Sequence, residues 1–262
     1  METRSAPSKR ARYGVPLGGV QHRVLMVGLA LVAVGALSRP GSAYVPVAKA
    51  AAFLFVASHL GILGAVLLGG TGLMGWVTRV ARFRDAERLL DEVAWSGGER
   101  VLDLGCGDGL IAIAAARRLS GGSVIAIDDW DRPHGTRKVT PEDVRANATA
   151  EGVDAKIEVR TSSFERLDVP DASVDVAAAC FSLHHLPPGT RAAAMRELAR
   201  VVRPGGRILI ADAGHRGEYA GALAAAGWSR VVQKSRTFPR FLFGWVIADK
   251  PVVKDSGTPP RA

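Results

Sequence analysis

The chain has 262 residues, of which 48% are hydrophobic and 23% charged, a composition typical of a globular domain with an additional segment. The net charge of +9 is unevenly distributed: residues 1–88 hold 11 Lys and Arg against 3 Asp and Glu, whereas residues 89–262 hold 23 against 22. The larger part of the chain therefore has no basic excess for nucleic acid, and we expect no nucleic-acid partner. Cys106 and Cys180 stand at neither metal-ligand nor disulfide-framework spacing, so we expect reduced thiols and no metal.

Two apolar segments lie in the basic part of the chain. Residues 24–37 are uncharged but number only 14, whereas residues 50–77 comprise 28 residues with His59 as the single ionisable group. The second segment is long enough for a hydrocarbon core of roughly 30 Å at about 1.5 Å per residue. The first can span only if residues 17–23 extend it, and otherwise resembles a signal-peptide core. A hairpin of two spans, a single span, and cleavage or burial all remain open.

Basic residues flank these segments unequally. Residues 1–23 hold five Lys and Arg and residues 79–88 hold four, but the connection over residues 38–49 holds two. Because basic residues collect on the cytoplasmic side, both ends are predicted to face the cytoplasm. The sequence thus predicts a basic segment at residues 1–23, then an anchor in the cell membrane at residues 24–78, with the domain that follows facing the cytoplasm.

Residues 79–98 follow as an amphipathic helix that Ser96, Gly97 and Gly98 end. Its apolar positions recur at helical spacing: Val80, Phe83, Ala86, Leu90 and Val93. The helix either lies on the membrane surface or covers the next domain.

From Glu99 onward, strand-like and helix-like patterns alternate, which favours a parallel sheet covered by helices. Expected strands are residues 101–104, 124–127, 157–159, 174–181 and 208–211, and expected helices are residues 110–119, 141–151, 189–202 and 218–226. Residues 229–234 and 242–250 form two more strands, joined too closely for a crossover helix. The fold class is therefore α/β, with an antiparallel hairpin ending the sheet. Residues 251–262 are predicted to be disordered.

The stretch VLDLGCGDGL combines a strand, a glycine-rich turn and the start of a helix. Gly105, Gly107 and Gly109 let the backbone turn sharply and approach a ligand, while the helix N-terminus offers unpaired N–H groups. A dinucleotide fingerprint needs a third glycine or alanine where this chain has Leu110. This position disfavours a nicotinamide-dependent oxidoreductase.

These residues resemble motif I of the class I methyltransferases that use S-adenosylmethionine. Further matches are Asp128 in VIAIDDW, the strand and turn VDVAAACFSLHHL, and the VVRPGG turn over residues 201–206. The resemblance covers residues 99–250 and is closest to the small-molecule branch that includes quinone-biosynthesis C-methyltransferases. It implies a Rossmann-like, seven-stranded sheet and S-adenosylmethionine as cofactor, with S-adenosylhomocysteine as product.

A carboxylate that ends the second strand can accept both hydroxyls of a ribose, so Asp128 is expected to bind the cofactor there, with neighbouring Asp129 as the second choice. The resemblance places Asp103 and the turn near the methionine part of the cofactor. For the adenine, the family often has an acidic residue where this chain has Ser163; Ser162 or a backbone group is the alternative, and Phe164 can pack on the ring. The full expected cofactor set is Asp103, Gly105, Cys106, Gly107, Gly109, Asp128, Asp129, Ser163, Phe164 and Cys180.

His184 and His185 follow the fourth strand, where the acceptor would meet the methyl group in this fold. Each is a candidate base or positioning group, and each is equally a candidate structural residue. Residues 129–140 are either a lid or an exposed loop. The first functional hypothesis is a membrane-anchored methyltransferase acting on a small, apolar or membrane-associated acceptor. The alternative is an inactive S-adenosylmethionine-binding module that acts as a scaffold or sensor at the membrane.

Overall fold

The computed structural model describes residues 26–27, 29–30, 59–70, 73, 82–131, 138–234 and 243–252. Among the described residues, the larger of two compact units holds those from Phe83 onward, except Lys138. In the other unit, residues 59–70 are helical and expose Ile62 and Val66. Within the described ranges, no helix has the length and apolar character needed to cross a membrane. Most of residues 24–37 and 50–77, where spans are predicted, lie outside these ranges.

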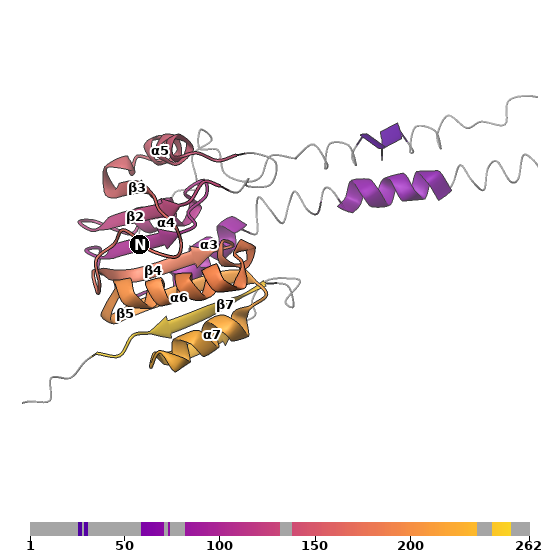
Figure 1. Cartoon of the computed structure of the whole chain (residues 1–262). Helices are drawn as coiled ribbons and strands as arrows, with labels where there is room; N and C mark the ends of the chain where they lie inside the picture. Colours follow the sequence, from indigo (N-terminus) through magenta and orange to yellow (C-terminus); the bar gives the residue numbers. More distant parts are fainter. Residues whose placement is uncertain are drawn as a thin grey trace, which may run out of the picture. The chain divides into compact units, whose positions relative to one another are not determined.

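The larger unit contains a seven-stranded sheet in the order β3-β2-β1-β4-β5-β7-β6 (Figure 1). Its strands are β1 (Arg100–Leu104), β2 (Ser123–Asp128), β3 (Ile157–Thr161), β4 (Val174–Cys180), β5 (Val202–Ala213), β6 (Ser229–Lys234) and β7 (Phe243–Asp249). The pairs among β1 to β5 are parallel, whereas β7 is antiparallel to both β5 and β6. The predicted parallel sheet with a terminal antiparallel hairpin is confirmed.

Helices cover both faces of this sheet. They are α3 (Arg82–Leu90), α4 (Leu110–Ala116), α5 (Pro141–Ala150), α6 (Pro188–Val201) and α7 (Arg216–Ala225), with 3-10 turns η2 (Asp154–Lys156) and η3 (Leu183–His185). Because strand side chains alternate, Val101 packs in one core cluster with α3, α4 and α5, and Leu102 packs in the other with α6 and α7. Figure 1 shows α6 lying across the β4–β5 part of the sheet.

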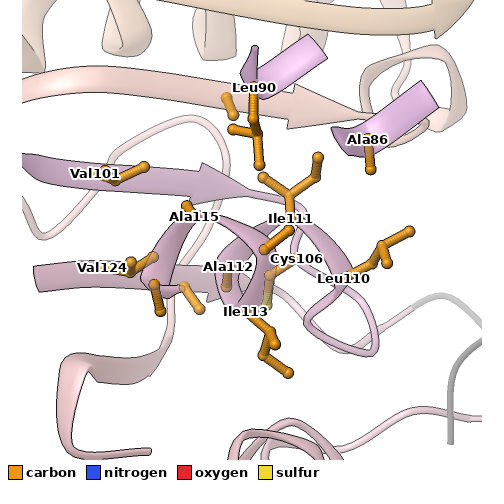
Figure 2. Close-up of a cluster of buried hydrophobic side chains, with 14 of the residues drawn as sticks. Ala86, Leu90, Val101, Cys106, Leu110, Ile111, Ala112, Ile113, Ala115 and Val124 are labelled. Atoms are coloured by element: carbon orange, nitrogen blue, oxygen red, sulfur yellow. The ribbon is translucent and has the colours of Figure 1, made fainter. Parts of the chain in front are cut away.

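Helix α3 is part of the first core. Ala86 and Leu90 are fully buried and lie over Ile111 of α4 (Figure 2). Arg118, just after α4, donates hydrogen bonds to the Glu87 backbone carbonyl and carboxylate. Of the two positions that the sequence left open for this helix, the described residues 83–90 therefore cover the domain.

Strand β5 begins earlier than the sequence pattern indicates. Residues 201–206 were expected to form a turn before a strand at 208–211, yet Val202 already pairs with Val174, and the register shifts before the next pair. Gly205 donates its N–H to the Lys250 carbonyl at 2.9 Å and Lys250 donates to the Gly206 carbonyl at 2.8 Å. These long-range bonds satisfy the backbone of the turn and join it to the sheet.

Candidate functional site

The parallel strands end at one edge of the sheet, and the expected site residues follow those ends. Strands β2 and β3 are added on one side of β1 and strands β4 and β5 on the other, so the order of strands changes direction at the β1–β4 boundary. Such a switch point is where open α/β sheets bind ligands. Across it, Ser182 donates its hydroxyl to the Leu104 carbonyl at 2.9 Å, which joins the ends of the two strands.

The glycine turn follows β1 and is bonded to β2. The N–H groups of Gly105 and Cys106 donate to the Ile127 carbonyl at 2.8 and 3.0 Å. Gly105 has φ +75°, and a Cβ there would lie 2.2 Å from the Ser182 Cβ. Only glycine fits at this position, because both its backbone conformation and its surroundings exclude a side chain. Gly109 has φ +85° and immediately precedes α4.

Asp103 lies beneath this turn and is 1% exposed. Its Oδ2 accepts the Ala112 N–H at 2.9 Å, but its Oδ1 has no hydrogen-bond partner among the described residues. Burial, together with the charges of Asp128 and Asp108, raises the pKa of Asp103 to about 8, although the bond from Ala112 opposes the rise. The turn is thus an acidic site suited to a cationic ligand.

Asp128 ends β2 and is bonded to the turn. Its Oδ2 accepts the Gly107 N–H at 2.9 Å and its Oδ1 accepts the Trp130 N–H at 3.1 Å. These bonds hold the carboxylate at the end of β2 beside the glycine turn. Asp129 instead accepts the Asp131 N–H at 3.2 Å, within its own loop. Half of the expected lid at residues 129–140, namely residues 132–137, lies outside the described residues.

The segment after β3 carries the residues expected to meet an adenine ring. Ser162 donates its hydroxyl to the Arg166 carbonyl at 3.0 Å, and Ser163 accepts the Glu165 N–H at 3.2 Å. Phe164 is 4% exposed, and its ring lies 3.4 Å from where a Cβ on Gly105 would be. The segment after β3 therefore reaches the glycine turn through the buried ring of Phe164, while the hydroxyls of Ser162 and Ser163 form hydrogen bonds within the segment itself.

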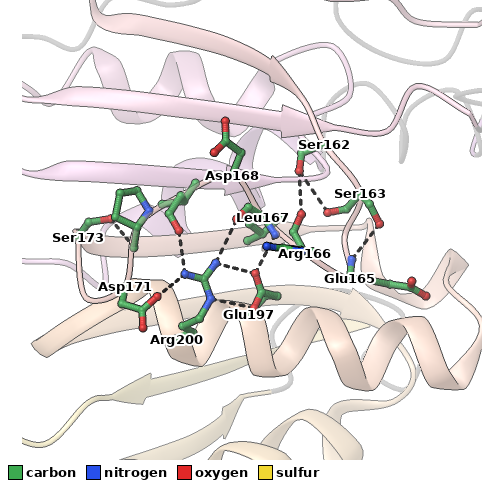
Figure 3. Close-up of polar contacts among 12 residues, drawn as sticks. Ser162, Ser163, Glu165, Arg166, Leu167, Asp168, Asp171, Ser173, Glu197 and Arg200 are labelled. Atoms are coloured by element: carbon green, nitrogen blue, oxygen red, sulfur yellow. Dashed lines mark hydrogen bonds and ion pairs between the residues drawn. The ribbon is translucent and has the colours of Figure 1, made fainter.

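A polar cluster attaches the same segment to α6 (Figure 3). Arg200 pairs with Glu197 at 2.6 Å and donates to the Leu167 carbonyl at 3.1 Å. Glu197 in turn accepts the Leu167 N–H at 2.7 Å. The hydrogen bond from Arg200, against a smaller effect of burial, lowers the pKa of Glu197. This cluster holds the β3–β4 connection against the helix.

His184 is held by a carboxylate that the sequence reasoning missed. Asp212 follows the core of β5, is 1% exposed, and accepts the His184 N–H at 2.9 Å, the Ala213 N–H at 2.9 Å and the Tyr219 hydroxyl at 3.0 Å. It also contacts His184 Nδ1. An acceptor carboxylate on the Nδ1 side favours the tautomer in which Nδ1 donates and Nε2 carries the lone pair. The His185 ring centroid lies 3.8 Å from that of His184.

A sequence signal for Asp212 exists. It directly follows the apolar run at residues 208–211, and the carboxyl ends of parallel strands share one edge, so an acidic residue there belongs with the site. Tyr219 has no comparable signal, because its apolar ring is equally typical of a core position.

The two cysteines lie in different surroundings, and that of Cys106 disfavours a reactive thiol. Cys106 is 6% exposed, and burial, with the nearby charges of Asp103 and Asp128, raises the pKa of its thiol well above the usual range. Cys180 is half-buried at the end of β4, opposite Ala211. Across the ranges that the structure describes, no group of His, Cys, Asp and Glu side chains is placed to hold a metal ion.

Comparisons with known proteins agree with this geometry. Residues 101–206 match the family model described as a methyltransferase domain. The 27-O-demethylrifamycin SV methyltransferase of Amycolatopsis mediterranei is 34% identical over 132 residues, 50% of this chain and 45% of that protein. The ubiquinone biosynthesis O-methyltransferase of Aeromonas salmonicida is 34% identical over 113 residues, 43% of this chain and 42% of that protein. The chain thus matches less than half the length of either relative.

Solved structures share the fold at lower identity. A SAM-dependent methyltransferase from Aquifex aeolicus has a TM-score of 0.52 at 23% identity, covering 63% of this chain and 89% of that one. The [4+2]-cyclase SpnF has a TM-score of 0.54 at 21% identity, covering 65% and 82%. The fold is therefore that of the class I S-adenosylmethionine-dependent methyltransferases, and a protein named for another reaction also has it.

Proposed function

We propose that this chain, in which residues 101–206 form a methyltransferase domain, transfers the methyl group of S-adenosylmethionine to a hydroxyl group of a small molecule. One observation carries the proposal: Asp103 presents a buried, unpartnered carboxylate oxygen beneath a glycine turn at the switch point of the sheet. The two relatives described above are named as methyltransferases, one of them explicitly an O-methyltransferase.

The residues present fit this cofactor. S-adenosylmethionine carries a positive sulfonium and an ammonium group; Asp128 supplies opposite charge beside the turn, and Asp103 does so when the bound cation favours its ionised form. We assign the ammonium to Asp103 and the ribose hydroxyls to Asp128, whose carboxylate ends β2 and is bonded to the glycine turn. Gly105 allows the turn its conformation, because neither its positive φ nor the neighbouring Ser182 leaves room for a side chain. Ser163, Phe164 and the other expected contacts, including Cys180, remain proposals.

The chain's own residues supply proton transfer and orientation. When bound, S-adenosylmethionine supplies an activated methyl group, so the protein needs to position the acceptor and, for a hydroxyl, to remove its proton. His184 Nε2 accepts that proton. Asp212 holds the opposite side of the ring at Nδ1 and stabilises the resulting imidazolium by its charge. Without a fixed carboxylate, the ring would lose both its tautomer and its orientation.

We further propose that residues 24–78 attach the chain to a membrane and that its acceptor is apolar. The support comes from the 28-residue segment 50–77, which contains no Asp, Glu, Lys or Arg. Flotation of the full chain with liposomes tests this: it should float, and replacement of Val66 and Leu67 by aspartate should reduce the floated fraction. Recovery of the unaltered chain at the bottom of the gradient would refute attachment.

Calorimetry on the full chain in mild detergent tests the function. S-adenosylmethionine and S-adenosylhomocysteine should bind and NAD should not. Asp128→Ala should weaken S-adenosylmethionine binding more than tenfold, because the carboxylate that accepts the two ribose hydroxyls is lost. Asp129→Ala should have a smaller effect on the affinity. Glu142→Ala, which removes a carboxylate that is 75% exposed, is the matched control.

Three results would count against parts of the proposal. Absent adenosyl binding would overturn it entirely, and an unchanged affinity in Asp128→Ala would refute the ribose role of that residue. Binding without transfer to any hydroxyl acceptor, tested on a panel of phenols, macrolides and membrane extracts, would favour the inactive binding module instead.

A further inference from the structure

Tyr219 is a fully buried tyrosine whose polar end meets a buried charge. It lies on α7, is 0% exposed, and packs in the core cluster under α6 and α7. Its hydroxyl donates to Asp212 Oδ2 at 3.0 Å. A phenylalanine would fill the same volume, so packing alone does not account for the hydroxyl.

We propose that Tyr219 is a positioning residue that acts on His184 through Asp212: its hydroxyl donates to Asp212 Oδ2 and thereby limits the negative charge that the carboxylate presents to the Nδ1 side of the His184 ring. This inference rests on the proposed function, in which His184 is the base. Tyr219 touches neither the acceptor nor the cofactor in this scheme, and it acts through Asp212.

The arrangement of donors around Asp212 gives the hydroxyl this role. Oδ2 receives the His184 N–H and the Tyr219 hydroxyl, and Oδ1 receives the Ala213 N–H. The two donors on Oδ2 stabilise the carboxylate charge at the oxygen that faces away from Nδ1. Deletion of the hydroxyl leaves one of them and a less satisfied buried charge, which then interacts more strongly with the His184 ring.

The tyrosine is held in the donating form. Burial, followed by the charge of Asp212, raises the pKa of Tyr219 well above its usual range, so the hydroxyl keeps its proton at every pH relevant to the reaction. An ionised Tyr219 would place a second negative charge against Asp212. The hydroxyl is therefore a constant donor, and Asp212 remains the acceptor.

Other charged and titratable groups surround this trio. From α6, Arg191 is 5% exposed and donates to Glu218 of α7 at 2.9 Å, and its charge acts on both Asp212 and Tyr219. The ring of His215, the residue before α7, lies 6.4 Å from the ring of Tyr219, and the His185 ring lies close to that of His184 at a tilt of 40°. None of these groups is altered by the variants below.

Histidine-selective nuclear magnetic resonance on the full chain provides the test, without cofactor or acceptor. The His184 resonance is assigned with His184→Asn, and its titration is compared between the unaltered chain, Tyr219→Phe and Asp212→Asn. Tyr219→Phe should raise the midpoint by about 0.5 to 1 pH unit, the equivalent of one hydrogen bond. Asp212→Asn should lower it, because the stabilising charge is gone. Ser173→Ala, which removes a hydroxyl bonded to Pro170 in the β3–β4 connection, should leave it unchanged.

Opposite shifts in the two variants support the proposal, since general loosening would move both midpoints in one direction. An unchanged midpoint in Tyr219→Phe, or a shift equal to that of Asp212→Asn, overturns it. If Tyr219→Phe does not fold, an unchanged midpoint in Asp212→Asn overturns it as well, since Tyr219 would then have no carboxylate through which to act. Because the titration needs no turnover, failure of methyl transfer would refute the proposed function separately.

Discussion

Replacement of Asp103 by asparagine should change how the stability of the chain depends on pH. The side chain is 1% exposed, and one of its oxygens has no partner among the described residues. Burial raises its pKa from 3.8 to about 8 in the folded state. Asparagine keeps the size and the acceptor for the Ala112 N–H, but it cannot ionise.

The sign and size follow from proton linkage. Between pH 3.8 and about 8 the folded chain holds a proton on Asp103 that the unfolded chain has lost. The contribution of Asp103 to the free energy of unfolding is therefore fully present below pH 3.8, its pKa in the unfolded chain. It is lost by about 1.4 kcal/mol per pH unit as the pH rises toward the folded-state pKa of about 8. Relative to the unaltered chain, Asp103→Asn should gain about 3 kcal/mol between pH 5 and pH 7.

Urea unfolding of both chains at pH 5, 6 and 7, followed by tryptophan fluorescence, measures this difference. If the free energy of unfolding changed with pH in the same way for both chains, Asp103 would be ionised in the folded state, and the reasoning from its burial would be wrong. The same reasoning applies to the ligand: a cationic cofactor favours the ionised carboxylate, so S-adenosylmethionine binding should release a proton from the unaltered chain and not from Asp103→Asn.

Two substitutions test the turn and the polar cluster. Gly105→Ala should abolish cofactor binding, because its Cβ would lie 2.2 Å from the Ser182 Cβ and would displace the turn. The control Gly217→Ala, where a Cβ meets nothing within 4 Å, should keep the affinity and stabilise α7 by about 0.5 kcal/mol. Equal cofactor affinities of the Gly105→Ala variant and the unaltered chain in calorimetry would contradict this role of the turn. Glu197→Gln should cost about 1–3 kcal/mol at pH 7, through loss of its charged bond with Arg200. That loss should shrink as pH falls below 4.5, since the lowered pKa of Glu197 makes its contribution one that acid removes; a pH-independent loss in urea unfolding would contradict the ion pair.

Local patterns were sufficient for the elements and for the glycine turn. The short apolar runs predicted the strands, because side chains buried on both faces of a parallel sheet leave little room for polar residues. Thr140 and Pro141 correctly marked the start of α5, where Thr140 donates its N–H to Asp143 at 3.0 Å. These signals lie within a few residues of each other, so no knowledge of the tertiary structure is needed to read them.

Boundaries that depend on distant partners were less predictable. Helix α4 was expected to reach residue 119, but it ends at Ala116. The N–H groups of Arg118 and Leu119 then donate to carbonyls three residues earlier, the hydrogen-bond pattern of a 3-10 turn. Strand β5 starts at Val202 because its partners in β4 and near Lys250 are available, which the residues themselves do not reveal.

By itself, the sequence determined the strand and helix alternation, the closing hairpin and the acidic glycine turn, because each depends on spacing along the chain. Only the tertiary structure brought Asp212 to His184, 28 residues away, and Ser182 to Leu104, 78 residues away. Those contacts depend on the order of the strands and on which carboxyl ends are neighbours. Strand order is set by the packing of both faces of the sheet, and that packing involves the whole domain at once.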